Sequence, residues 1–224
     1  MDEEATRPAE PGSPEPGAYE HLRTLSDARE LRALAHPVRM ALYEVLALHQ
    51  SLTATQASKL VGGSPSSVAY HLRTLAKYGY VEETNDGTGR ERPWRLAEIG
   101  FNFSGNSDDP EANAAADALA RQMFKRWLER RDEYKRSKDR WSEEVREATG
   151  DSNMILFGTV EEFRELREGF ARLTAKYFDR IADPALRPEG SQVFELQLFT
   201  HPIDISSVAR ADDDEDEDSA PEEH

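Results

Sequence analysis

The spacing of the apolar residues changes at Gly79, and this change constrains the fold more than any other feature of the sequence. Before it, Val68, Leu72 and Leu75 recur at helical spacing and predict a helix over 66–77 with one buried stripe. After it, residues 80–84 and 92–97 are predicted strands joined by the turn sequence Asn-Asp-Gly-Thr-Gly. Gly79 stands where a glycine ends a helix. Few folds contain a helix that leads directly into a β-hairpin.

Three further helices are predicted before this one. Asp27 is a suitable N-cap for a helix that ends at Ala35, and Pro37 suits the first turn of the next helix, which ends near His49. A short helix follows over 53–60, and Gly62-Gly63 separates it from the helix over 66–77. Helix, helix, short helix, tight turn, helix and hairpin is the order of a winged helix-turn-helix domain, here expected over 19–100.

The second half of the chain is predicted to add helices and a little sheet. Residues 101–109 are interpreted as a linker, and 110–149 as one long amphipathic helix. Candidate strands at 154–157 and 193–200 flank a helix over 160–181, which predicts a small βαβ-like unit within 110–208. The expected fold class is therefore mainly α with small β (α+β).

The formal net charge of −16 argues against nucleic-acid binding until its distribution is considered. Fourteen of the sixteen negative charges lie in residues 1–20 (net −5) and 211–224 (net −9), whereas 21–100 carries a net +2. The ends, 1–18 and 209–224, are predicted to be disordered acidic tails. The C-terminal tail either keeps the protein in solution or competes with DNA for the basic surface.

Several classes of site are excluded by composition. There is no cysteine, so disulfides, thiolate metal sites and cysteine nucleophiles are ruled out. No apolar stretch is long enough for a membrane span, and no secretory signal begins the sequence, so a cytoplasmic protein without a membrane partner is expected. No cofactor is predicted.

The helix over 65–78 has the residues that a DNA-reading helix needs. Small side chains at its start let the DNA backbone approach, and longer donors further along reach the base edges. Arg73 is the candidate for base readout, and Tyr70 for a sugar or a thymine methyl. His71 borders the buried stripe, so it either packs in the core or faces a phosphate. For the candidates in the preceding helix, the alternative to DNA contact is helix capping. The candidate DNA-binding residues of the two helices are Thr55, Gln56, Ser64, Ser66, Ser67, Tyr70, His71, Arg73 and Thr74.

The hairpin over 80–97 supplies a second candidate contact. Arg90 and Arg92 share one face of a strand because alternate residues point the same way. They are predicted to bind phosphates or the minor groove, and the alternative is an ordinary charged hairpin tip. Removing them separates the two interpretations, because DNA contact predicts a salt-dependent loss of affinity.

An aromatic stripe follows the long helix and has three interpretations. It can be core, the seam of a dimer, or the lining of an effector pocket. The spacing favours core or a dimer seam. Its members are Leu119, Met123, Trp127, Tyr134 and Trp141.

The first half of the chain resembles a known family over about 28–97. The resemblance is carried by Leu34-Ala35-His36-Pro37-Val38-Arg39, Ser66-Ser67-Val68, His71-Leu72, Leu75 and Gly79-Tyr80-Val81, and it is to the winged-helix domain of ArsR-type bacterial transcriptional regulators. It implies a homodimeric regulator whose helix at 65–78 reads an operator half-site. Metal-sensing members carry cysteines in the helix that corresponds to 53–60, and this chain has none, so no metal site is predicted.

Two other classes of function compete with this interpretation. An enzyme is disfavoured, because the rest of the chain is too short for a complete cofactor domain and has no glycine-rich fingerprint or nucleophile motif. A winged helix used only for protein–protein contact would carry acids on its second helix, and 66–77 has none. The sequence therefore predicts a one-component, homodimeric regulator of transcription that binds operator DNA, with a small-molecule effector left open.

Overall fold

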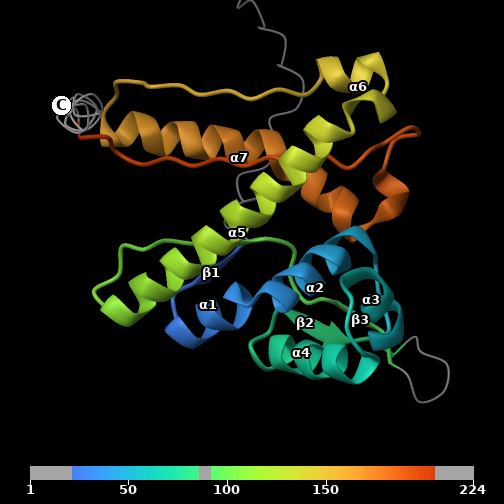
Figure 1. The fold of residues 1–224 in the computed structure, drawn as a ribbon. Coiled ribbons are helices and arrows are strands. Elements are labelled where there is room, and N and C mark those ends of the chain that lie inside the picture. Colours follow the sequence, from blue (N-terminus) through green and yellow to red (C-terminus); the bar gives the residue numbers. More distant parts are fainter. Residues whose placement is uncertain (1–21, 86–91, 205–224) are drawn as a thin grey trace, which may run out of the picture. The chain divides into compact units, whose positions relative to one another are not determined.

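The computed structural model describes residues 22–85 and 92–204 (Figure 1). The chain divides into two units, 1–187 and 188–224. The elements of the first unit, in chain order, are β1 (Arg23–Leu25), α1 (Ala28–Ala35), α2 (Pro37–Leu48), α3 (Ala54–Val61), α4 (Pro65–Lys77), β2 (Val81–Glu83), β3 (Trp94–Leu96), β4 (Phe101–Phe103), α5 (Pro110–Arg136), a 3₁₀ turn (Lys138–Arg140), α6 (Glu143–Glu147), α7 (Val160–Ala182) and a second 3₁₀ turn (Pro184–Leu186).

The first four helices begin and end where the sequence predicts. The Asp27 carboxylate accepts a hydrogen bond from the Arg29 amide at 2.7 Å and starts α1. Pro37 occupies the first turn of α2, where its missing N–H costs nothing. Gly79 has a φ of 74°, which a glycine adopts without strain as it follows α4.

The predicted hairpin is confirmed and is extended by one bridge. β2 and β3 are antiparallel, with Glu82 opposite Arg95. Leu52, just before α3, exchanges two backbone hydrogen bonds with Trp94 at 2.8 and 2.9 Å. This bridge ties the start of the helix-turn-helix to the base of the wing.

The interpretation of 101–109 as a linker is wrong for its first three residues. Phe101–Phe103 forms β4, which pairs in parallel with β1, so that Arg23 lies opposite Phe101. The apolar-polar-apolar alternation of Phe-Asn-Phe is too short to show a strand by itself. Pairing with a distant segment of the chain decides it.

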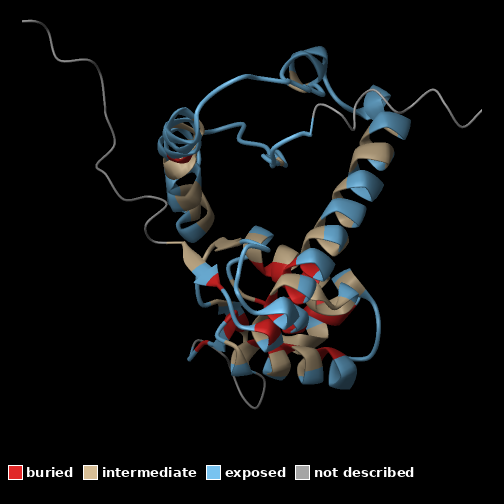
Figure 2. Ribbon diagram, turned by 90° about the vertical axis from the view of Figure 1, so that its left-hand side faces the viewer, coloured by how far each residue is buried: buried red, intermediate tan, exposed pale blue. Residues whose placement is uncertain are grey.

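The core lies in the winged-helix part and continues into the first turns of α5 (Figure 2). Burial of one leucine side chain in this core contributes roughly 1.5–3 kcal/mol to the stability of the fold. By contrast, Ala171 is the one buried residue in the described helices after α5. The α5 residues of the core are Ala112, Ala115, Ala116 and Leu119.

The predicted helix over 110–149 ends earlier than expected. α5 stops at Arg136, and the Ser137 hydroxyl donates to the Glu133 carbonyl at 2.7 Å. Ser142 then accepts a hydrogen bond from the Val145 amide and caps α6. Serines at these two positions satisfy helix ends, and this local bonding divides the helix that the apolar spacing predicts.

The helix of the βαβ-like unit forms, but its two strands do not. α7 covers Val160–Ala182 and begins with a capping box between Thr159 and Glu162. Residues 154–157 and 193–200 belong to neither sheet that the structure describes. Their composition is that of strands, but a strand also needs a neighbouring backbone to pair with.

Candidate nucleic-acid interface

Serines surround the start of α4. The Ser64 hydroxyl accepts a hydrogen bond from the Ser67 amide at 3.2 Å and lies 3.0 Å from the Ser66 hydroxyl. Residues 62–67 are exposed, and both glycines before Ser64 have positive φ. This short, small-residue turn lets a phosphate backbone come close to the first turn of the helix.

One side of α4 is buried and the other is open, as the sequence predicts. Val68, Leu72 and Leu75 are buried, whereas the side chain of Tyr70 is 61% exposed. Arg73 is exposed and makes no hydrogen bond or ion pair to any residue that the structure describes. Its guanidinium group is therefore available to a ligand outside the chain.

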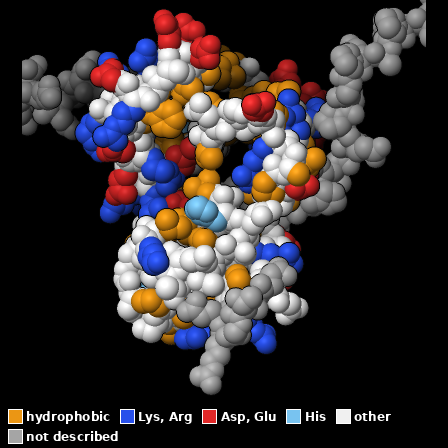
Figure 3. Space-filling model, turned by 90° about the vertical axis from the view of Figure 1, so that its right-hand side faces the viewer, with side chains coloured by type: hydrophobic (Ala, Val, Ile, Leu, Met, Phe, Trp, Pro, Cys, Tyr) orange, Lys and Arg blue, Asp and Glu red, His pale blue; other side chains and the backbone are white. Residues whose placement is uncertain are grey.

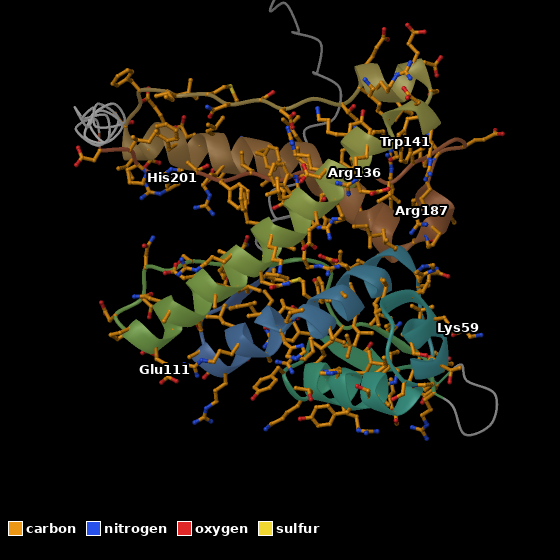
Figure 4. The ribbon with its side chains drawn as sticks, viewed as in Figure 1. Lys59, Glu111, Arg136, Trp141, Arg187 and His201 are labelled. Atoms are coloured by element: carbon orange, nitrogen blue, oxygen red, sulfur yellow. The ribbon has the colours of Figure 1, made fainter. Side chains whose placement is uncertain are left out.

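Few side chains on this surface carry a negative charge. α4 itself contains no Asp or Glu, and over α3 and α4 basic side chains are prominent among the charged ones (Figure 3). Lys59 projects from α3 into solvent (Figure 4). Thr74, by contrast, donates its hydroxyl to the Tyr70 carbonyl at 3.0 Å, so this hydrogen is used within the helix.

His71 is partly buried and is paired with a second histidine. Its ring centroid lies 4.9 Å from that of His36, the N-cap of α2. The Nδ1 atom of His71 is buried and has no hydrogen-bond partner among the described residues. Burial lowers the pKa of His71, and His36 and Arg39 lower it further. The sequence pointed to a border position for His71 but gave no sign of its partner.

Thr55 and Gln56 take part in the start of α3. The Gln56 side chain accepts from the Thr53 amide at 2.8 Å, and the Thr53 hydroxyl accepts from the Gln56 amide at 3.2 Å, which completes a capping box. The Thr55 carbonyl accepts from the Ser58 hydroxyl. The Gln56 side chain therefore has a structural role as part of this cap.

Glutamates on β2 neutralise the basic residues at the base of the wing. Arg92 lies 3.6 Å from the Glu83 carboxylate, and Arg95 lies 2.7 Å from that of Glu82. Arg90 lies outside the described residues. These ion pairs were not predicted from the sequence, although the strand register of the hairpin places Glu82 opposite Arg95.

Of the five aromatic and apolar residues assigned to a single stripe, four lie on α5 and one lies beyond its end. Leu119 is fully buried and Met123 packs against the same core. Trp141 lies beyond the end of α5, although its ring returns to within 6.3 Å of Tyr134. Trp127 is half-buried and stacks at 5.4 Å on Phe124, which is exposed along with Leu128.

Ion pairs hold the middle of α5 against α2. The Arg126 Nε donates to the Glu44 carboxylate at 2.9 Å, and Arg130 reaches the same carboxylate at 3.1 Å. Further along, Arg131 and Lys135 pair with Asp151. Much of the basic character of α5 is therefore neutralised by tertiary contacts and is not open to DNA.

Comparison with known proteins agrees with this geometry. Residues 34–84 match the family model of a helix-turn-helix domain, which covers α2 to β2. No curated protein matches the chain. The chain thus carries a winged helix-turn-helix domain, and such a domain points to a DNA-binding regulator of transcription. None of the described helices has the length and apolar character that a membrane crossing needs.

Proposed function

We propose that this chain is a homodimeric, one-component transcriptional regulator of the ArsR type, and not an enzyme. It acts in the cytoplasm on a pseudo-palindromic operator. α4 enters the major groove of each half-site, and the wing contacts the adjacent backbone. Two such helices related by a twofold axis read half-sites about one helical turn apart.

The observation that carries the proposal is the open face of α4. Small serines begin it, followed by an exposed tyrosine and an arginine that pairs with no described residue, and no acidic residue lies on the helix. Arg73 is assigned to base edges, most simply to O6 and N7 of a guanine. Ser66 and Ser67 are assigned to phosphates at the start of the helix.

The exposed apolar side chains of α5 support the dimer. Phe124 and Leu128 are about two-fifths exposed and lie one turn apart on the same helix. Burying them against a second copy removes apolar surface from water. An effector bound beside Trp127 is the second use that we propose for this part of the helix.

The test is DNA binding by the full chain over a salt series, with operator sequences selected from a random pool. Arg73→Ala is expected to lower specific affinity by about five- to a hundredfold and to relax the preference at one position in each half-site. Arg167→Ala, which removes an exposed arginine from α7, is the matched control and is expected to leave affinity unchanged.

The outcome also decides between the two candidate functions. Specific binding that Arg73→Ala leaves intact would show that another residue reads the bases, while the class of protein stands. An absence of DNA binding at low salt would support the alternative, a winged helix that binds another protein.

A further inference from the structure

Residues 192–200 form the most exposed apolar segment of the described second unit. The side chains of Val193, Phe194, Leu196, Leu198 and Phe199 are all more than half exposed. Leu196 in the centre is 67% exposed. A contiguous apolar surface of this kind marks a place where a protein binds something else.

The pattern within this segment is that of a half-buried strand. Phe194, Leu196 and Leu198 alternate with Glu195 and Gln197, so one face of an extended chain here is entirely apolar. Pro202 cannot donate a ladder hydrogen bond and ends the stretch. The segment nevertheless belongs to neither of the two sheets among the described residues.

The segment is complementary to itself when two copies run antiparallel about Leu196. Phe194 then lies opposite Leu198, Val193 opposite Phe199, and Glu195 opposite Gln197. Every apolar residue meets an apolar residue, and each glutamate meets an amide. Opposed pairs of this kind are what stabilise an antiparallel ladder.

Other arrangements of two copies fit poorly. Centring the pair on Glu195 places two carboxylates directly opposite each other, and centring it on Gln197 places Glu195 opposite Phe199. A parallel, in-register pair brings the two Glu195 side chains together. The residue pattern therefore selects one register, and that register has twofold symmetry.

We propose that residues 192–200 pair with the same residues of a second copy, as an antiparallel two-stranded ribbon centred on Leu196. This inference rests on the proposed dimer and locates one part of its interface. A ribbon of two strands is marginally stable by itself, so its apolar face needs a cover.

The proposal is tested by disulfide formation between single introduced cysteines, because the chain has no cysteine of its own. Opposed residues of an antiparallel pair have Cα atoms about 4.5–5.5 Å apart, within the range of a disulfide. Leu196→Cys is expected to give a covalent dimer on mild oxidation. Leu186→Cys, another exposed leucine ten residues earlier, is the matched control and is expected to stay monomeric on denaturing gels.

A second pair of variants tests the register. Phe194→Cys alone is expected not to cross-link, whereas its equimolar mixture with Leu198→Cys is expected to give a mixed covalent dimer. Gln197→Lys places a cation opposite Glu195 of the other copy and is expected to lower the dissociation constant of the dimer by about two- to thirtyfold. Gln197→Glu is expected to raise it by a similar factor.

The results that overturn the proposal are equally specific. They are a full-length protein that sediments as a monomer at tens of micromolar, cross-linking by Phe194→Cys as strong as by Leu196→Cys, or an intramolecular disulfide in the double variant Ile155→Cys/Leu196→Cys. The last would assign the strand partner to the same chain. Operator binding measured on the same samples reports on the proposed function separately, so failure of the ribbon is not confused with failure of DNA recognition.

Discussion

The imidazole rings of His36 and His71 lie 4.9 Å apart and join the start of α2 to the middle of α4. The His36 Nδ1 accepts a hydrogen bond from the Val38 amide at 3.2 Å, so this nitrogen is unprotonated. Arg39 lies close enough to act on both rings and is held by the carbonyls of Ala33 and Arg32. A proton on either ring would therefore add a positive charge beside Arg39.

The free energy of unfolding is expected to fall as the pH is lowered from 8 to 5.5. Burial lowers the pKa of both histidines from the ordinary value of 6.5, and the positive charge of Arg39 lowers both further. The unfolded chain takes up protons near pH 6.5 and the folded chain only at lower pH. The stabilisation is thus complete above pH 6.5 and is lost as the pH falls toward the folded pKa.

Urea unfolding at several pH values measures this effect. The double variant His36→Gln/His71→Gln is expected to show a flatter pH dependence than the wild type. His49→Gln removes a histidine that is exposed at the end of α2 and serves as the control. Parallel curves for the wild type and the double variant would show that the pair does not govern the pH response.

Releasing Arg92 from its ion pair is expected to strengthen DNA binding. Glu83→Gln removes the carboxylate 3.6 Å from Arg92, and an exposed pair of this kind is worth about 0–1 kcal/mol, so affinity should rise by up to about fivefold. Arg92→Ala should lower affinity and reduce the slope of log K against log salt by about one. Glu168→Gln on α7 is the charge-matched control, and an equal gain with it would attribute the effect to net charge.

Leu119 is expected to be a main stabilising contact of α5. Its side chain is fully buried, so Leu119→Ala should lower the free energy of unfolding by about 2–5 kcal/mol. Leu173→Ala makes the same change on α7, where the side chain is 73% exposed, and should have a small effect. Equal losses in chemical denaturation would contradict the described packing of α5.

The turn before α4 is expected to require a glycine at position 62. Gly62 has a φ of 83° and a ψ of 176°, a region that side chains with a Cβ avoid, so Gly62→Ala should cost about 1–3 kcal/mol. No neighbouring atom would be touched, so the cost comes from the backbone alone. Gly150→Ala, where φ is not positive and a Cβ would meet no atom within 4 Å, should be neutral in the same thermal unfolding assay.

The acidic residues at the C-terminus lie outside the described residues, and their role is predicted from charge alone. Truncation near Ala209 removes the nine acids of residues 211–224. If this tail competes with DNA for the basic surface, the truncated chain should bind operator more tightly, most clearly at low salt. Unchanged affinity in a titration at low and high salt would leave the tail with a solubilising role.

Local signals in the sequence were sufficient for the helix-turn-helix and its wing. The caps Asp27 and Ser64, the breaks at Gly62 and Gly79 and the stripe of Val68, Leu72 and Leu75 each act within a few residues. The exposed face of α4 follows from that stripe, because a helix with one buried side presents the other. Fold and candidate interface were predictable there because each depends on neighbours in the chain.

Contacts between distant segments could not be predicted from such local signals. The sequence by itself determined the winged helix-turn-helix and the exposed face of α4. Tertiary structure alone decided that Phe101–Phe103 pairs with Arg23–Leu25, that Glu82 and Glu83 neutralise the wing, that His36 meets His71, and that 154–157 and 193–200 stay outside the described sheets. The physical reason is that helices satisfy their backbone within the segment, whereas strands and ion pairs need a partner that only the folded chain, or a second copy, brings near.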